Sequence, residues 1–190
     1  MKIGVRIASK PKKNRFVLII SGEITEKTYI GFLDNLNDYI LNKDEYDGIT
    51  LYITSNGGSA SIAFAMYDLL RSITDDICTL AIGDCSSAAN VLFSLGKKRF
   101  STENTTFLIH SARIFYNLQQ TPNITFYTNK LLVDVNERML KVLEKVIKPN
   151  YFEEKFKNVI EMSQEMIYSV DEMMKFGLVT DKLKNFEDIL

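Results

Sequence analysis

Apolar residues recur along the chain in two alternating patterns, one typical of β-strands and one typical of α-helices. Short apolar runs predict strands at residues 16–20, 49–54, 77–82 and 106–109. Apolar residues spaced three and four positions apart predict helices between them, at residues 26–41, 61–72 and 88–95. Because strands and helices alternate with short connections, the sequence predicts an α/β protein with a mostly parallel sheet flanked by helices.

The longest helical pattern covers residues 122–148, with Thr121 suited to the N-cap, Pro122 to the first position and Pro149 to the end. A helix of about 25 residues would be about 37 Å long. This is more than a domain of this size needs, so we expect part of the helix to project and to pack on another subunit. Farther along, Ser169 and Glu172 have the spacing of a capping box that opens a short helix.

Composition and charge exclude several classes of protein. The 190 residues are 46% apolar, enough for one core, and no apolar run approaches the ~18 residues that suggest a membrane span. Lys and Arg (23) nearly balance Asp and Glu (24), whereas nucleic-acid-binding proteins usually carry a basic excess. We therefore expect a cytoplasmic protein with no membrane or nucleic-acid partner, made of a loose arm at 1–15 and a single domain at 16–190.

Metal and disulfide chemistry have little support in the sequence. One histidine and two cysteines are too few for a Cys/His zinc site. Cys78 and Cys85 bracket a predicted strand that would hold them about 20 Å apart, which is beyond disulfide reach. Cys78 is predicted to be a small core residue and Cys85 to lie in the turn after the strand. We expect no metal and no organic cofactor.

Three of the predicted strands are followed by residues suited to nucleophilic catalysis. The second strand is followed by Gly57 and Gly58, the third by Ser86 and Ser87, and the fourth by His110, the only histidine. In parallel α/β sheets, ligands collect beyond the carboxyl ends of the strands. Convergence of these residues would supply a hydroxyl, a base and backbone N–H donors for an oxyanion. Taken singly, each has a simpler explanation as a turn, a helix cap or a structural histidine.

Three segments, LYITSNGGSASIAFAMYDLL, LAIGDCSSAANVLFSLGKKRF and NTTFLIHSAR, resemble the ClpP family, the proteolytic subunit of the Clp protease. The resemblance extends from Phe16 to Asp181, nearly the whole chain. It implies the ββα superhelix shared with crotonase-type proteins, in which the long helix is part of a handle at about 111–148. It also implies a homo-oligomeric ring, in some members two stacked rings, and an ATPase partner.

Carried over by position, the resemblance implies that Ser87 is the nucleophile and His110 the general base. The backbone N–H groups of Gly57 and Ala88 would then form the oxyanion hole. Glu165 falls at the position of the third catalytic residue, where the family has an aspartate.

Two other residues remain as alternatives. Asp171 is a weaker candidate for the third member, because its position suits a charge in the first turn of a helix. Cys85 is a weaker candidate for the nucleophile, because the family spacing selects Ser87.

The implied activity is that of a serine endopeptidase that cleaves peptides or unfolded proteins through an acyl-enzyme. The segment after His110 lacks the Gln-Pro and Gly-rich stretch typical of the family, and the N-terminus lacks the usual axial-loop sequence. Ring pairing and ATPase docking therefore stay open. Two alternatives also stay open: a catalytically silent subunit of a mixed ring, and an acyl-CoA enzyme of the crotonase type.

Overall fold

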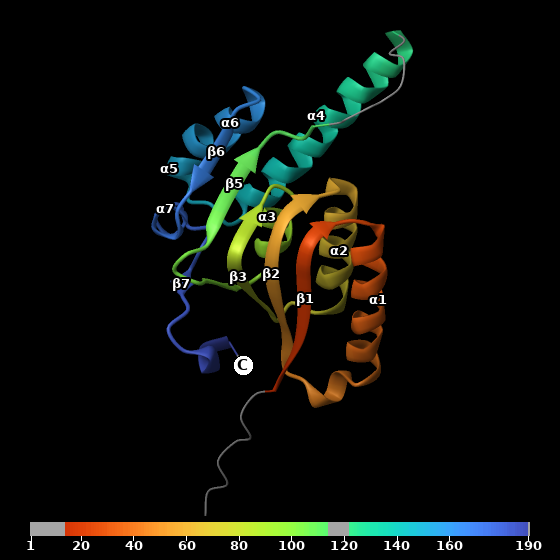
Figure 1. Ribbon diagram of the computed structural model, residues 1–190, viewed down its shortest axis with the longest axis vertical. Helices are drawn as coiled ribbons and strands as arrows, with labels where there is room; N and C mark the ends of the chain where they lie inside the picture. Colours follow the sequence, from red (N-terminus) through yellow and green to blue (C-terminus); the bar gives the residue numbers. More distant parts are fainter. Residues whose placement is uncertain (1–13, 114–121, 190) are drawn as a thin grey trace, which may run out of the picture.

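One seven-stranded sheet forms the centre of the part of the chain that the computed structural model describes, residues 14–113 and 122–189 (Figure 1). The predicted arm at 1–15 lies outside this part except for its last two residues. So do Thr121, the predicted N-cap of the long helix, and residues 114–120 of the predicted handle.

The strands are β1 (Arg15–Ile24), β2 (Gly48–Gly58), β3 (Ile77–Ser86), β4 (Lys98–Ser101), β5 (Thr106–His110), β6 (Glu165–Tyr168) and β7 (Asp181–Lys182). Neighbours in the order β1-β2-β3-β4-β7 run parallel. The first half of β3 pairs with β4, and its second half pairs in parallel with β5. Among the described strands only β6 runs antiparallel, beside β5. The predicted mostly parallel α/β sheet is confirmed.

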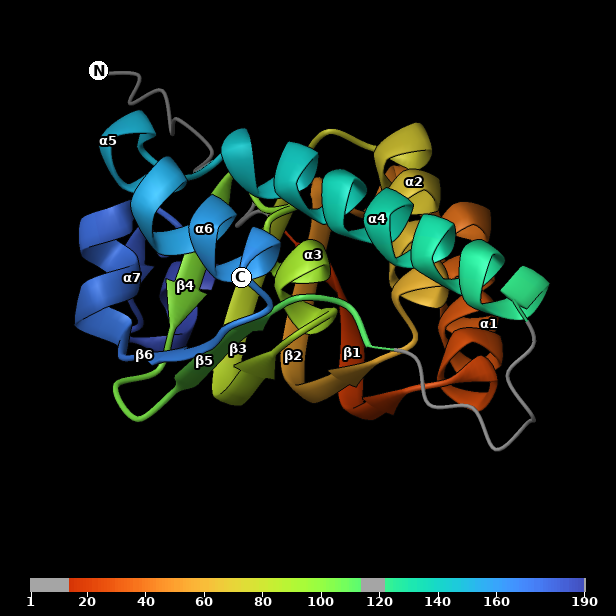
Figure 2. The ribbon, with the colours of Figure 1, turned by 90° about the horizontal axis from the view of Figure 1, so that it is seen from above.

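The helices are α1 (Glu26–Leu41), α2 (Ala60–Ile73), α3 (Ala89–Phe93), α4 (Pro122–Glu144), α5 (Pro149–Phe152), α6 (Asn158–Glu161) and α7 (Val170–Phe176). Single turns η1 (Lys43–Glu45), η2 (Glu153–Lys157) and η3 (Phe186–Ile189) complete the described elements. Figure 2 shows α1, α2 and α4 along one side of the strands. None of the helices in the described ranges combines the length and apolar character needed to cross a membrane.

Two helix starts follow directly from their capping residues. The Thr25 hydroxyl accepts a hydrogen bond from the Thr28 N–H at the start of α1 (3.3 Å), as expected for an N-cap. The predicted capping box at α7 is also present, because the Ser169 hydroxyl and the Glu172 carboxylate each accept from the other residue's backbone N–H. Gly177 ends α7 in the left-handed conformation, at φ 101°.

Helix α4 is shorter than predicted, ending at Glu144 rather than at residue 148. The backbone N–H groups of Val146 and Ile147 both donate to the Leu143 carbonyl, which closes the helix in a tight turn. Pro149 therefore opens the next helix, α5, instead of ending the long one. The N-terminal half of α4 projects beyond the sheet (Figure 1), as the sequence suggested.

Both faces of the sheet are covered, and β3 shows how. Ile77 and Ala81 belong to the large apolar cluster under the helices. Cys78 and Leu80, which alternate with them along the strand, belong to a smaller cluster that Ile189 of η3 covers. Since side chains alternate between faces along a strand, the C-terminal turn closes the face that the long helices leave open.

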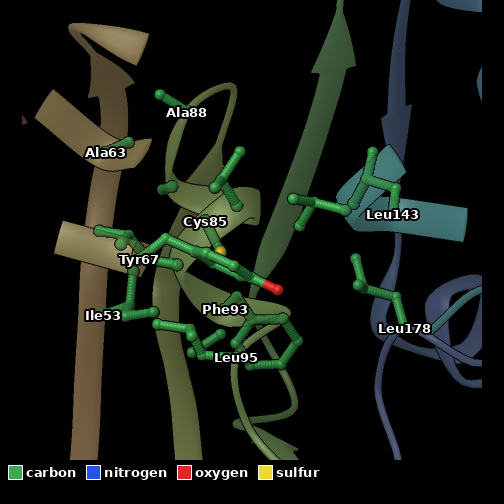
Figure 3. Packing of buried hydrophobic residues seen from close by; sticks show 14 of the residues in the cluster. Ile53, Ala63, Tyr67, Cys85, Ala88, Phe93, Leu95, Leu143 and Leu178 are labelled. Carbon is green, nitrogen blue, oxygen red and sulfur yellow. The ribbon is translucent and has the colours of Figure 1, made fainter. Parts of the chain in front are cut away.

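The position of Cys85 differs from the prediction. Cys85 is part of β3, paired with Ser55 of β2 and Phe107 of β5, and not of a turn beyond the strand. Its side chain lies in the large cluster near Phe93 (Figure 3) and is fully buried. Cys78 is a small core residue, as predicted, and both thiols are free.

Candidate active site

The register of three neighbouring strands brings the predicted site residues together. Ser86 at the end of β3 pairs with Leu108 of β5, two residues before His110. On the other side of β3, Ser55 of β2 pairs with Cys85. The residues that follow β3 therefore emerge between His110 and the end of β2 at Gly57 and Gly58.

Gly57 approaches Ser87 so closely that a side chain would not fit between them. A Cβ built on Gly57 would stand 2.7 Å from the Ser87 Cβ and 2.8 Å from the Ser86 carbonyl oxygen. Gly57 also has φ +95°, a backbone conformation that glycine adopts readily. Gly57 thus lies in β2, not in the turn that the sequence suggested, and it makes room for the serine.

These residues line a pocket of about 590 Å³ between the strand ends and the helices. Its polar side consists of the backbone of Gly57, Gly58 and Ala88 and of polar side chains: Glu23, Asn56, Ser59, Ser61, Ser87, His110 and Arg113. The remaining wall is mostly apolar and comes from α2, α3 and α4: Phe64, Val91, Leu131, Leu132, Val135 and Met139. The pocket therefore combines candidate reactive groups with a surface suited to an apolar side chain.

Ser87 has a strained backbone for which no helix end accounts. Among the described residues, Ser87 (φ 55°) and Ser163 (φ 54°) are the two non-glycine residues with positive φ. Ser163 follows α6, where a left-handed residue commonly ends a helix. Ser87 instead stands between β3 and α3, in a conformation that costs about 1–3 kcal/mol. Such strain is typical of a residue held in place for function.

The His110 ring is held by a main-chain carbonyl. Its Nδ1 lies 2.6 Å from the carbonyl oxygen of Ser111. Since a carbonyl oxygen only accepts, Nδ1 carries the proton, and in the neutral ring Nε2 is then the nitrogen with a free lone pair. This tautomer is the one that a general base needs.

Glu165 lies directly opposite His110 in the β5–β6 ladder, but its carboxylate binds another group. The guanidinium of Arg113 donates to its Oε2 at 2.6 Å. This hydrogen bond and the charge of Arg113 lower the pKa of Glu165, and His110 adds a smaller effect in the same direction. The structure thus places Glu165 beside His110, with its hydrogen bond going to Arg113. The alternative Asp171 is far more exposed and pairs with Lys182 at 2.8 Å.

The two expected oxyanion donors differ in their availability. The N–H of Gly57 donates to the hydroxyl of buried Ser55 at 3.1 Å. The Ala88 N–H takes part in no hydrogen bond within the described part of the chain. Gly58 is a further candidate, because the Ser59 N–H faces β1 and donates to the Ile24 carbonyl (2.9 Å). Along a strand, the N–H groups of successive residues point to opposite sides. The Gly58 N–H therefore points away from β1.

Cys85, the alternative nucleophile, lacks the properties of a reactive thiol. Burial, and then the charge of Asp84, raise its pKa well above the usual value, so the thiol stays protonated at neutral pH. It is fully buried, and it does not line the pocket. Ser87, which does, remains the better candidate.

Sequence reasoning overlooked Arg113, Gly58 and Asn90. Arg113 belongs to no recognisable motif. It binds Glu165 only because strand β6, which the sequence did not predict, pairs with β5 and brings Glu165 beside His110. Gly58 was noted only as part of a turn. Asn90 lies three residues after Ser87, where a buried amide in a short apolar helix was a signal that could have been noticed.

Two comparisons of the sequence with known proteins show its family. The sequence model of the Clp protease family matches residues 4–185. The ATP-dependent Clp protease proteolytic subunit 2 of Frankia casuarinae is 29% identical over 148 residues, which is 77% of this chain. The match spans 65% of the length of that relative. Because the family match covers nearly the whole sequence, the chain belongs to the Clp protease family.

Proposed function

We propose that this protein is a serine endopeptidase of the ClpP type, with Ser87 as nucleophile and His110 as general base. The observation that carries the proposal is the pocket wall, where a strained serine, a histidine in the right tautomer and a glycine packed against that serine lie together. Family membership supports a peptidase.

The proposed reaction is acyl transfer to Ser87. His110 Nε2 takes the hydroxyl proton as the Ser87 oxygen attacks a peptide carbonyl, and the Ala88 N–H binds the oxyanion that forms. His110 then protonates the leaving amine, and later activates the water that hydrolyses the acyl-enzyme. The second oxyanion donor is Gly57, once it is released from Ser55, or Gly58.

The proposed third member is Glu165, acting through its charge. Opposite residues in an antiparallel ladder have Cβ atoms about 4.5–5.5 Å apart, close enough for a carboxylate to stabilise an imidazolium. The Ser111 carbonyl meanwhile orients the ring. Arg113 keeps Glu165 ionised, because it lowers the pKa of that carboxyl.

The proposed substrates are peptides or unfolded protein segments that place an apolar side chain against the wall formed by α2, α3 and α4. The proposed assembly is a homo-oligomeric ring.

Substitution of the proposed nucleophile tests the function. Ser87→Ala should lower peptide hydrolysis by at least about 10³-fold and abolish fluorophosphonate labelling, since it removes the attacking oxygen. Ser86→Ala is the matched control, because the Ser86 hydroxyl is nearby but donates to Asp84. Undiminished hydrolysis by Ser87→Ala, with the fold preserved, would exclude Ser87 as nucleophile.

A second candidate function is a catalytically silent subunit. It is favoured by two hydrogen bonds in the structure, from Gly57 N–H to Ser55 and from Arg113 to Glu165. The first occupies a candidate oxyanion donor, and the second directs the Glu165 carboxylate to Arg113, with no hydrogen bond from His110 among the described residues. The labelling experiment separates the two functions, because a silent subunit leaves Ser87 unmodified even in the assembled wild-type protein.

A further inference from the structure

Asn90 is a fully buried amide that binds two carbonyl groups on either side of the candidate site. Its Nδ2 donates to the carbonyl of Ser87 at 3.2 Å and to the carbonyl of Leu108 at 2.9 Å. Ser87 belongs to the turn after β3, and Leu108 belongs to β5, two residues before His110. One side chain therefore links the segment carrying the nucleophile to the strand carrying the base.

The same carbonyls take part in two backbone hydrogen bonds. The Ser87 N–H donates to the Leu108 carbonyl (2.8 Å), and the Asn90 N–H donates to the Ser87 carbonyl (3.1 Å). The backbone N–H and the carbonyl of Ser87 are thus both held by hydrogen bonds. The two carbonyls that accept these bonds, those of Leu108 and Ser87, also accept from the Asn90 side chain. A left-handed non-glycine residue persists only where its surroundings determine it in this way.

The other end of the Asn90 amide is not satisfied. Its Oδ1 is buried and has no hydrogen-bond partner among the described residues. A buried polar atom without a partner is unfavourable for stability. The side chain is therefore better explained by what its Nδ2 holds in place than by a contribution to folding.

We propose that Asn90 is a positioning residue that sets the separation of Ser87 from His110. It holds the left-handed turn of Ser87 against β5, on the wall of the pocket that His110 of the same strand also lines. The inference rests on the proposed peptidase function and adds a residue to it that touches neither the substrate nor the reacting atoms.

Two substitutions and a control test this role in the full-length protein. Asn90→Leu keeps the branched shape of the side chain and removes the donors, and Asn90→Ala is the second variant in case the first does not fold. We expect kcat, and the rate of fluorophosphonate labelling, to fall about 10- to 100-fold with KM unchanged, because small misplacements have effects of this size.

The matched control is Thr79→Val. The Thr79 hydroxyl is also fully buried and also ties α3 to the sheet, through the Phe93 carbonyl (2.9 Å), but at the end of α3 away from Ser87. We expect this variant to lose stability and to keep the wild-type labelling rate. Wild-type labelling by folded Asn90→Leu or Asn90→Ala, or an equal loss in Thr79→Val, would overturn the inference.

Hydrogen exchange of the Ser87 amide gives a reading that is independent of catalysis. Its N–H should exchange faster in Asn90→Leu than in the wild type or in Thr79→Val, because the turn is no longer held against β5. An unchanged exchange rate would overturn the inference by itself. If the wild type does not label, the peptidase function fails, and the exchange measurement still decides whether Asn90 fixes the turn.

Discussion

Gly57 and Gly22 share a left-handed backbone but differ in what surrounds them. A Cβ on Gly57 would collide with Ser87 and Ser86, whereas nothing lies within 4 Å of one on Gly22 (φ +76°). We expect Gly22→Ala to lower the free energy of unfolding by about 1 kcal/mol, from backbone strain alone.

Gly57→Ala should lower it by about 2–4 kcal/mol, because overpacking adds to the strain. It should also abolish labelling of Ser87, since the serine has to move. Denaturant unfolding and fluorophosphonate labelling of both variants measure this difference. Equal stability of the two variants, with labelling intact, would show that Gly57 does not constrain the serine.

At the scale of single residues, the sequence patterns predicted Gly57, Ser87, Ala88 and His110 on the pocket wall but not the charges around them. Ser87, His110 and Gly57 could be predicted because each lies within a few residues of the end of a recognisable apolar run. The ion pair between Arg113 and Glu165 could not, because it depends on a ladder between β5 and a four-residue strand that has no alternating pattern. The hydrogen bond from the Gly57 N–H to the Ser55 hydroxyl likewise depends on the rotamer of Ser55, which no sequence pattern predicts.

At the scale of elements, the capping box of α7 predicts a measurable pH dependence. Hydrogen bonds from the Ser169 backbone N–H and then from its hydroxyl lower the pKa of Glu172 in the folded protein. A carboxyl whose pKa is lower in the folded than in the unfolded state stabilises the fold above its unfolded pKa. That stability is lost as the pH falls through the folded pKa.

Glu172→Gln keeps the length of the side chain and removes its charge. At pH 7 we expect the variant to be less stable by about 0.3–1 kcal/mol, the usual effect of a negative charge at a helix N-terminus. The difference should shrink toward zero in acid, below the folded pKa of Glu172. Denaturant unfolding of the variant and the wild type across this pH range measures the difference. Glu45→Gln, which removes an exposed carboxylate outside the capping box, is the control for the change in net charge. A difference that grows in acid would contradict the assignment.

The elements that the sequence predicted are those whose hydrophobic pattern is long enough to be periodic. Helix α1 has the predicted bounds, because its apolar face and its Thr25 cap agree. Strands β2 and β3 run farther than predicted, through polar residues such as Asn56 and Asp84. Backbone hydrogen bonds to neighbouring strands define those extensions. The hydrophobic pattern does not predict such bonds. Strands β4 and β7, with four and two residues, contain one apolar residue between them, so no apolar run marks them.

At the scale of the whole molecule, α4 joins the candidate site to an exposed apolar surface. Its inner residues, such as Val135 and Met139, are buried and line the pocket. Its projecting half instead exposes Phe126 and Tyr127, by 66% and 70%, with their rings 5.7 Å apart. Large exposed aromatic side chains on a projecting helix are typical of an interaction surface, in agreement with the expectation that this helix packs on another subunit.

If subunits associate through this surface, Phe126→Glu should separate them. A carboxylate buried without a partner is strongly unfavourable, and the substitution is repeated in every subunit. We expect a lower mass in analytical ultracentrifugation, and peptide hydrolysis reduced at least about tenfold, since α4 is also a wall of the site. Lys130→Glu, on the same exposed helix, changes the charge by more without removing an apolar contact. It should keep both the mass and the activity. An unchanged mass for Phe126→Glu would show that subunits do not associate through this end of α4, and the coupling between assembly and site would then have to come from another surface.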